Sequence, residues 1–357
     1  MTSEWNHSTI NDVCVLVTDG SHSSPKSVND GKYMVSVKDF TDYGFDFTSC
    51  RMISNDDYET LKRNGCVPQI DDILIGKDGA RFFEDIIIYR QREKPALLSS
   101  IAILRCDKSK ILPDFLYYVL RTPSFRQDVK DNYGSGSAIP RIILKDFKRM
   151  MVSYPSLEKQ QAIISVLTAI DSKIQANTEI NDNLMQQAVA IFKSWFVEYS
   201  PFDGIAPKEW KTVNLEKITA LICRGIAPKY SDNSNQTVIN QKCIRDHMID
   251  LSQARTHTPK VINEKWLRFG DLLINSTGDG TLGRTAQVWF QPQNITVDSH
   301  VTIVRPAKEN LIFYIGLWGI LHEREIECLH TGSTGQTELP KERVKALELH
   351  LPDNGTL

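Results

Sequence analysis

The most regular hydrophobic pattern in the 357-residue chain lies between residues 155 and 199. Mainly apolar positions recur there in alternating steps of four and three residues, which is the heptad spacing of a helix that pairs with another helix. A helix of roughly 40 residues would be on the order of 60 Å long. The stripe, named here the α-stripe, consists of Ile163, Leu167, Ile170, Ile174, Asn177, Asn181, Leu184, Ala188, Ile191 and Trp195.

The ends and the middle of the α-stripe support the helical interpretation. Pro155 supplies a start signal, and Pro201 and Gly204 supply a stop signal. Asn177 and Asn181 fall on the stripe near its middle, where buried amides cost stability but fix the register and orientation of a partner. A buried helix of a larger domain is the alternative, which the charged and amide residues on the opposite face disfavour.

The segments on either side of this helix resemble each other. Glu4 and Trp5 return as Glu209 and Trp210, displaced by 205 residues. Further blocks follow in the same order, with displacements that drift only between 197 and 205 residues. A repeat this long indicates a duplicated domain and not a stacked array of short units.

The shared blocks predict the same elements in both copies. One helix is expected in each copy, and a glycine-serine loop that closes on a proline, Pro140 or Pro340, follows it. The expected strands lie at 34–42 and 238–246, at 72–75 and 271–274, and at 99–105 and 299–305, and the expected helices at 113–132 and 309–330.

These elements predict a mixed α/β fold. Two duplicated domains, residues 1–154 and 200–351, are separated by a long coiled-coil-type helix over residues 155–199. Residues 352–357 would begin a second helix of the same kind.

Composition excludes several classes of protein. With 41% hydrophobic and 24% charged residues and a net charge of -2, the chain looks like an ordinary globular protein. Its seven cysteines form no CxxC pair, which fits reduced thiols in the cytoplasm better than disulfides or a zinc site. The longest apolar run, residues 311–321, is too short to span a bilayer, so no membrane association is expected.

Sequence motifs for catalysis are missing. The chain has no GxxxxGK[ST] phosphate loop, no GxGxxG opening a helix, no HExxH pair and no GxSxG elbow. Asp146 and Lys148 form a nuclease-like Asp-x-Lys triplet, but the second copy does not preserve it around Glu342 to Lys345. We therefore expect no catalytic residue, no metal and no cofactor, and a chain that binds instead of one that catalyses.

Polar side chains in equivalent loops of both copies suit nucleic-acid binding. Affinity for DNA needs Lys and Arg near phosphates, and specificity needs Arg, Lys, Asn or Gln at base edges. A solvated surface role is the alternative for each residue taken alone. The DNA-binding candidates are Lys77, Arg81, Ser135, Ser137 and Arg141 in the first copy and Arg224, Lys229, Asn275, Ser276, Arg284, Thr334 and Gln336 in the second.

This combination resembles the specificity subunit of type I restriction-modification systems. The resemblance covers nearly the whole chain, and its most specific part is PSLEKQQAIISVLTAIDSKIQANTEINDNLMQQAVAIFKSWF at 155–196, which is similar to that family's central spacer helix. In the family each globular copy is a target recognition domain that reads one half of a split DNA sequence, and two spacer helices pair antiparallel. The resemblance implies a non-catalytic subunit whose partners are double-stranded DNA, the modification subunits that methylate adenine, and the restriction subunit.

One departure from the family and two alternative functions follow. The family carries a second spacer helix after the second recognition domain, whereas this sequence ends at Leu357. We expect the α-stripe to pair with a helix of another chain or to make the protein self-associate. The alternatives are a protein-interaction adaptor with duplicated domains and no DNA role, and a stand-alone nuclease or methyltransferase, although the Asn/Asp-Pro-Pro-Tyr/Phe signature of the latter is missing.

Overall fold

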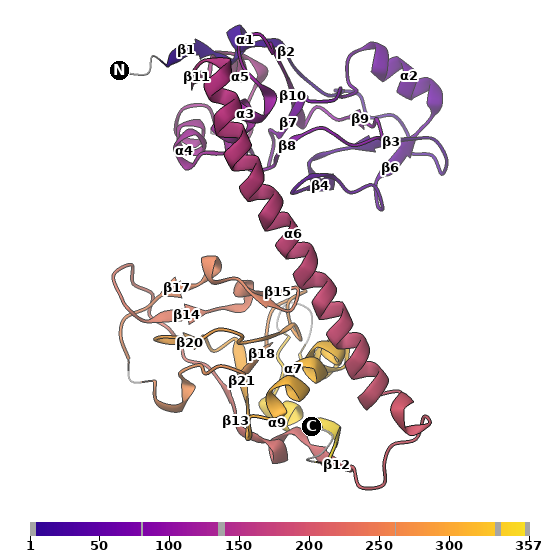
Figure 1. Cartoon of the computed structure of the whole chain (residues 1–357), viewed down its shortest axis with the longest axis vertical. Helices are drawn as coiled ribbons and strands as arrows, with labels where there is room; N and C mark the ends of the chain where they lie inside the picture. The colour runs from indigo at the N-terminus through magenta and orange to yellow at the C-terminus, as the bar shows by residue number, and fades with distance from the viewer. Residues whose placement is uncertain (1–4, 80, 135–139, 261, 333–336, 354–357) are drawn as a thin grey trace. The chain divides into compact units, whose positions relative to one another are not determined.

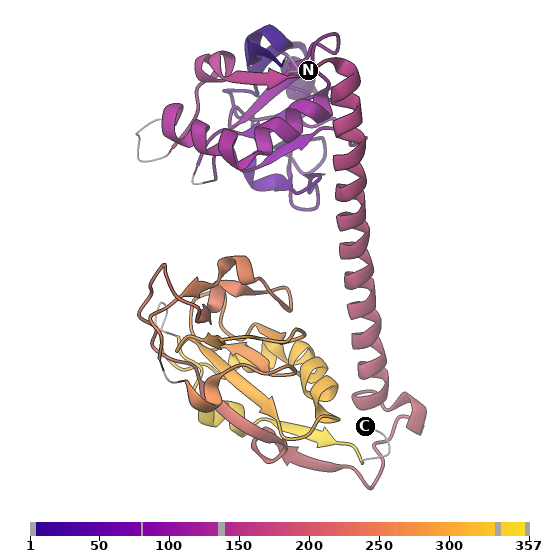
Figure 2. The same cartoon turned by 60° about the vertical axis from the view of Figure 1, so that its left-hand side comes forward.

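The computed structural model describes residues 5–79, 81–134, 140–260, 262–332 and 337–353. Its contacts divide the chain into two compact units, Met1–Ala176 and Asn177–Leu357 (Figure 1). The long helix predicted from the heptad pattern is confirmed as α6, which is continuous over Leu157–Phe196 (Figure 2). The boundary between the units falls inside α6, so the domain limits 1–154 and 200–351 stay predictions.

The first unit is built on a four-stranded antiparallel sheet in the order β2-β10-β7-β8. A smaller sheet, β6-β3-β9, lies beside it, and β1 pairs with β11. The elements are β1 (Asn6–Thr9), α1 (Ile10–Val13), β2 (Cys14–Asp19), β3 (Lys32–Val35), β4 (Phe40–Thr41), β5 (Gly44–Phe45), β6 (Arg51–Ile53), α2 (Asn55–Arg63), β7 (Ile73–Gly76), β8 (Ile86–Ile88), β9 (Ala96–Leu97), β10 (Ile101–Cys106), α3 (Pro113–Arg121), α4 (Pro123–Asn132), α5 (Leu144–Arg149) and β11 (Met151–Tyr154).

The second unit has the same topology. Its four-stranded sheet has the order β13-β21-β18-β19, its smaller sheet the order β17-β14-β20, and β12 pairs with β22. The elements are β12 (Lys211–Asn214), β13 (Thr219–Arg224), β14 (Thr237–Ile239), β15 (Ile244–Arg245), β16 (Met248–Ile249), β17 (Arg255–Thr256), β18 (Leu272–Asn275), β19 (Thr285–Gln287), β20 (Ile295–Val297), β21 (Val301–Pro306), α7 (Leu311–Leu321), α8 (Glu323–Cys328), α9 (Lys341–Lys345) and β22 (Glu348–Leu351).

The registers of the strands confirm the duplication residue by residue. Val17 of β2 lies opposite Leu104 of β10, and Ile222 of β13 lies opposite Val304 of β21. These partners are displaced by 205 and 200 residues, as the sequence repeat predicts. The mixed α/β fold with two duplicated parts and a long helix is therefore confirmed.

Both faces of each central sheet are covered, which explains why its strands are continuously apolar. Successive side chains of a strand point to opposite faces. Ile73 and Ile75 of β7 pack with Phe115 of α3 in one core, whereas Leu74 packs with Val35 of β3 in another. In the second unit Leu272, Ile274 and Leu273 divide in the same way.

The single helix predicted over 113–132 is wrong, because the structure has two helices there. Thr122 separates α3 from α4 and caps α4, accepting a hydrogen bond from the Phe125 N–H at 3.3 Å. Pro123 at the first position of α4 has no N–H with which to continue the hydrogen-bond ladder of α3. The second copy breaks similarly at His322, between α7 and α8.

A buried ion pair recurs between the central strands of both units. The Arg105 guanidinium donates to both carboxylate oxygens of Asp72 at 2.8 Å, and Arg305 donates to those of Asp271 at 2.7 and 2.8 Å. Such bidentate bonds join the turn before β7 or β18 to the end of the neighbouring strand. The aspartate before each apolar strand, which is shared by both copies, is explained by this pair.

Replacing Arg305 with methionine is expected to lower the free energy of unfolding of the second unit by about 3–5 kcal/mol, because Asp271 would stay buried without its partner. The matched variant Arg105→Met should cost less, since the Arg105 side chain is 29% exposed and that of Arg305 only 8%. Urea denaturation followed by circular dichroism measures both. Equal losses in the two variants, or no loss in Arg305→Met, would contradict this reading of the pair.

Candidate nucleic-acid interface

In each unit the loops that hold the predicted DNA-binding residues meet at one edge of the central sheet. Because neighbouring strands are antiparallel, the end of β7 lies beside the start of β10. The Ile142 N–H donates to the Lys77 carbonyl at 3.0 Å, and the Leu339 N–H donates to the Ser276 carbonyl at 2.8 Å. This makes Ile142 and Leu339 equivalent, so the matching of Pro140 with Pro340 from the sequence was wrong.

A glycine at the end of β2 or β13 allows this edge to form. The Gly20 and Gly225 N–H groups each donate to a β10 or β21 carbonyl at 3.1 Å. A Cβ atom on Gly20 would lie 2.3 Å from the Leu97 carbonyl oxygen, and one on Gly225 would lie 2.0 Å from that of Val297. Only glycine permits such close backbone approach.

In the first unit the predicted cations are largely neutralised by carboxylates. Lys77 is 7% exposed, and its ammonium lies 3.3 Å from Asp19. Arg81 is exposed but pairs with Asp85 at 2.7 Å. Arg141 is exposed and forms an isolated β-bridge with Asp78.

In the second unit two of the predicted residues are buried. The Asn275 side-chain N–H donates to the Gln241 carbonyl at 3.1 Å, and Ser276 shares a hydrogen bond of 2.6 Å with the Thr302 hydroxyl. Both are fully buried. They therefore position the loop after β18 and do not present its outer surface.

A polar network that the sequence did not single out lies at the same edge. The Gln241 amide donates to the Thr277 hydroxyl at 3.0 Å and accepts from the Thr281 hydroxyl at 3.0 Å. Thr277 also lies 2.8 Å from Nδ1 of His300. Gln241 replaces an apolar residue, Val37, at the equivalent position of the first copy, and that difference was the signal available in the sequence.

Three predicted cations of the second unit differ in their surroundings. Arg224 donates to Glu338 at 2.7 Å and to the Leu339 carbonyl at 2.8 Å, which fixes it to the loop before α9. Arg284 donates to the Gly280 carbonyl at 2.8 Å. Within the described parts of the chain, no carboxylate pairs with Arg284 or with the exposed Lys229.

Four of the predicted site residues lie outside the described residues: Ser135, Ser137, Thr334 and Gln336.

Most of the α-stripe is exposed on α6. Ile170, Leu184 and Ile191 are 51%, 57% and 60% exposed. A neighbouring face of the helix is buried instead, through Ile164 in the core of the first unit and Phe192 in the core of the second. A separate stripe of α6 thus remains for another partner.

A buried carboxylate links three elements of the second unit. Glu323 at the start of α8 accepts a hydrogen bond from the Thr285 hydroxyl of β19 at 3.0 Å and lies 3.2 Å from His247, in the turn between β15 and β16. Hydrogen bonding to Glu323 raises the pKa of His247. Burial opposes ionisation of Glu323, but the hydrogen bonds from His247 and Thr285 hold its pKa below the usual range.

Searches for other site types gave negative results over the described ranges. They contain no group of three or more His, Cys, Asp or Glu side chains arranged to hold a metal ion. They also contain no helix with both the length and the apolar character needed to cross a membrane.

Comparison with known proteins identifies the class of chain to which this geometry belongs. Over 224 residues the chain is 26% identical to the type I restriction enzyme MjaIX specificity subunit of Methanocaldococcus jannaschii, covering 57% of this chain and 50% of that protein. Over 131 residues it is 32% identical to the HindI specificity subunit of Haemophilus influenzae, covering 36% and 28%. The chain thus spans half or less of these two relatives.

A solved structure has the same fold. The type I restriction-modification system S subunit from M. genitalium superimposes with a TM-score of 0.53 at 14% identity, covering 98% of this chain and 85% of that one. A family model described as the type I restriction modification DNA specificity domain matches residues 2–186, just over half of the 357 residues. The chain belongs to this family.

The pair of His247 and Glu323 predicts a pH-dependent contribution to stability. Since the pKa of His247 is raised from 6.5, this contribution is fully present below 6.5 and is lost as the pH rises through the raised value. The loss of unfolding free energy caused by His247→Gln should therefore be larger at about pH 5.5, where Glu323 is still ionised, than at about pH 8.5. Urea denaturation at both pH values measures it. The exposed His330, replaced by Gln, is the control, and a pH-independent effect of His247→Gln would refute the assignment.

Proposed function

We propose that this chain is the non-catalytic DNA-recognition subunit of a type I restriction-modification complex. Each unit, as a target recognition domain, reads one half of a bipartite sequence in double-stranded DNA, and α6 sets the spacing between the halves. The observation that carries the proposal is the duplication: two copies of one fold, each with a polar loop edge, joined to one long helix. Two readers held at a fixed separation recognise half-sites at a fixed spacing.

The loop edge of the second unit suits contact with phosphates and bases. Lys229 and Arg284 keep uncompensated positive charge there, which phosphate binding requires. Thr277, Gln241 and His300 offer hydrogen-bonding groups of the kind that read base edges. Asn275 and Ser276 would act indirectly, by holding the loop, because both are buried.

In the first unit the same edge is more acidic. Asp19, Asp78 and Asp85 surround the predicted cations Lys77 and Arg81. Repulsion between carboxylates and phosphates would make this edge contribute less to affinity. We therefore propose that the second unit supplies more of the salt-sensitive affinity, with the first unit contributing chiefly to sequence choice.

The remaining partners follow from the family. Modification subunits that methylate adenine, and a restriction subunit, would supply the catalysis in the cytoplasm, docking on the scaffold that α6 provides. The exposed α-stripe supports pairing of α6 with another helix, including self-association of this chain. A monomer in light scattering at tens of micromolar would count against self-association.

Selection from a random duplex library followed by sequencing tests the proposal against a protein-interaction adaptor without a DNA role. Enrichment of two short motifs separated by a constant gap is the expected result. Binding that is neither sequence-selective nor sensitive to salt would favour the adaptor.

Lys229→Ala is expected to weaken binding of the selected duplex by several-fold and to reduce the slope of log affinity against log salt by about one, because one phosphate contact is lost. Lys217 is an equally exposed lysine at the opposite end of β13, so Lys217→Ala is the matched control. Fluorescence anisotropy at several salt concentrations measures both. Identical salt slopes for the two variants would remove Lys229 from the interface.

A further inference from the structure

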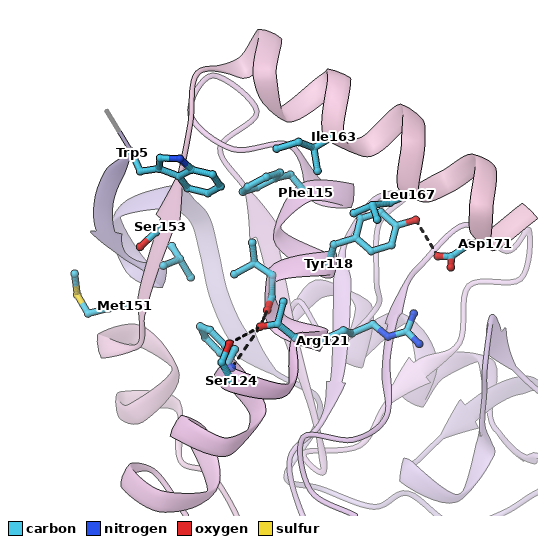
Figure 3. Close-up of a pocket in the computed structure, with 14 residues that line it drawn as sticks. Trp5, Phe115, Tyr118, Arg121, Ser124, Met151, Ser153, Ile163, Leu167 and Asp171 are labelled. Carbon is cyan, nitrogen blue, oxygen red and sulfur yellow. Dashed lines mark hydrogen bonds between the residues drawn. The ribbon is translucent and has the colours of Figure 1, made fainter. Parts of the chain in front are cut away.

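A hollow of about 770 Å³ lies in the first unit beside the start of α6 (Figure 3). Its walls come from the N-terminal segment, α3, β11 and α6, and they are mainly apolar. Trp5 and Phe115 stand on one side, and Ile163 and Leu167 of the α-stripe on another. The Tyr118 hydroxyl donates to Asp171 at 2.9 Å at one end.

The hollow exposes a tryptophan that is covered at the equivalent place in the second unit. Trp5 is 42% exposed, whereas Trp210, displaced by 205 residues, is 8% exposed. Phe115 and Ser153 of the hollow correspond likewise to Tyr314 and His350, by the displacements that align α3 with α7 and β11 with β22.

What covers the surface in the second unit is the aromatic end of α6. The Phe196 ring lies 5.6 Å from Trp210 and 5.1 Å from Tyr314, and the Phe192 ring lies 5.2 Å from Tyr314. Tyr199, just after α6, lies 5.9 Å from Trp210. Aromatic side chains at positions i, i+4 and i+7 therefore fill this surface, which is the spacing of one face of a helix.

We infer that the hollow beside Trp5 is the docking site for the C-terminal end of a helix from another chain that carries aromatic residues with the Phe192, Phe196 and Tyr199 spacing. The duplicated fold carries the inference, because the same surface in the second unit already holds such an end. Ile163 and Leu167 line the hollow at the start of α6, so the incoming helix runs antiparallel to α6. The inference rests on the proposed pairing of α6 with another helix and names the place where that helix ends.

The test uses the full chain and a fluorescein-labelled peptide of residues 183–202 of this sequence, which carries the aromatic end. Fluorescence anisotropy should show saturable binding. A peptide with Phe192→Ala and Phe196→Ala should bind at least about tenfold more weakly, since each aromatic ring buries 150–250 Å² in such contacts. The altered peptide keeps Leu184, Ile191 and Trp195, so binding along the α-stripe alone would leave the two peptides equal and would overturn the inference.

A tryptophan variant of the chain locates the site. Trp5→Ala should weaken binding of the unaltered peptide at least about tenfold, whereas Trp289→Ala, which removes a tryptophan that is 39% exposed in the second unit, should not change it. Because Trp5 is 42% exposed, its replacement should leave the thermal unfolding of the chain unchanged. Unchanged affinity in Trp5→Ala, as when the peptide displaces the end of α6 from the second unit, would overturn the inference. A chain that selects a split duplex motif but binds no peptide contradicts this inference and leaves the proposed function standing.

Discussion

The bidentate bond between a strand-preceding aspartate and an arginine on the neighbouring strand holds each unit's sheet in register. In the second unit Asp271 also accepts the Arg268 N–H at 2.8 Å, and Arg305 also donates to the carbonyls of Glu264 and Trp266. A buried pair that loses one member leaves an uncompensated charge. With this edge of the sheet fixed, β7 and β18 deliver their following loops to the opposite edge, where the candidate interface lies.

The long helix adds a second constraint. One face of α6 is used by its own units through Ile164 and Phe192, and the α-stripe remains exposed. Exposed aliphatic side chains in heptad spacing are stabilised only when another helix covers them. The chain therefore combines two features that suit a scaffold: rigid loop edges for recognition, and an unburied stripe for assembly.

The sequence predicted the large features because they depend on periodicity and repetition. The heptad spacing located α6, and the recurrence of Asp72 as Asp271 located equivalent strands. The break at Thr122 was missed because the apolar pattern continues through it and only Pro123 marks the boundary. The site was predicted least well: Lys77, Asn275 and Ser276 are buried, since residue type and position in a loop do not show which way a side chain points. Gln241 was missed because it comes from a distant strand, and only the fold brings it beside Thr277.

The distance that α6 sets between two readers can be measured directly by lengthening the helix. Inserting one heptad between Glu179 and Ile180 keeps the α-stripe in phase and extends the helix by about 10 Å, which is roughly three base pairs of duplex DNA. Selection and sequencing of duplexes bound by the lengthened chain should return the same two half-sites with a gap about three base pairs wider. The same gap in both chains would contradict the role of α6 as the spacer between two DNA-reading units.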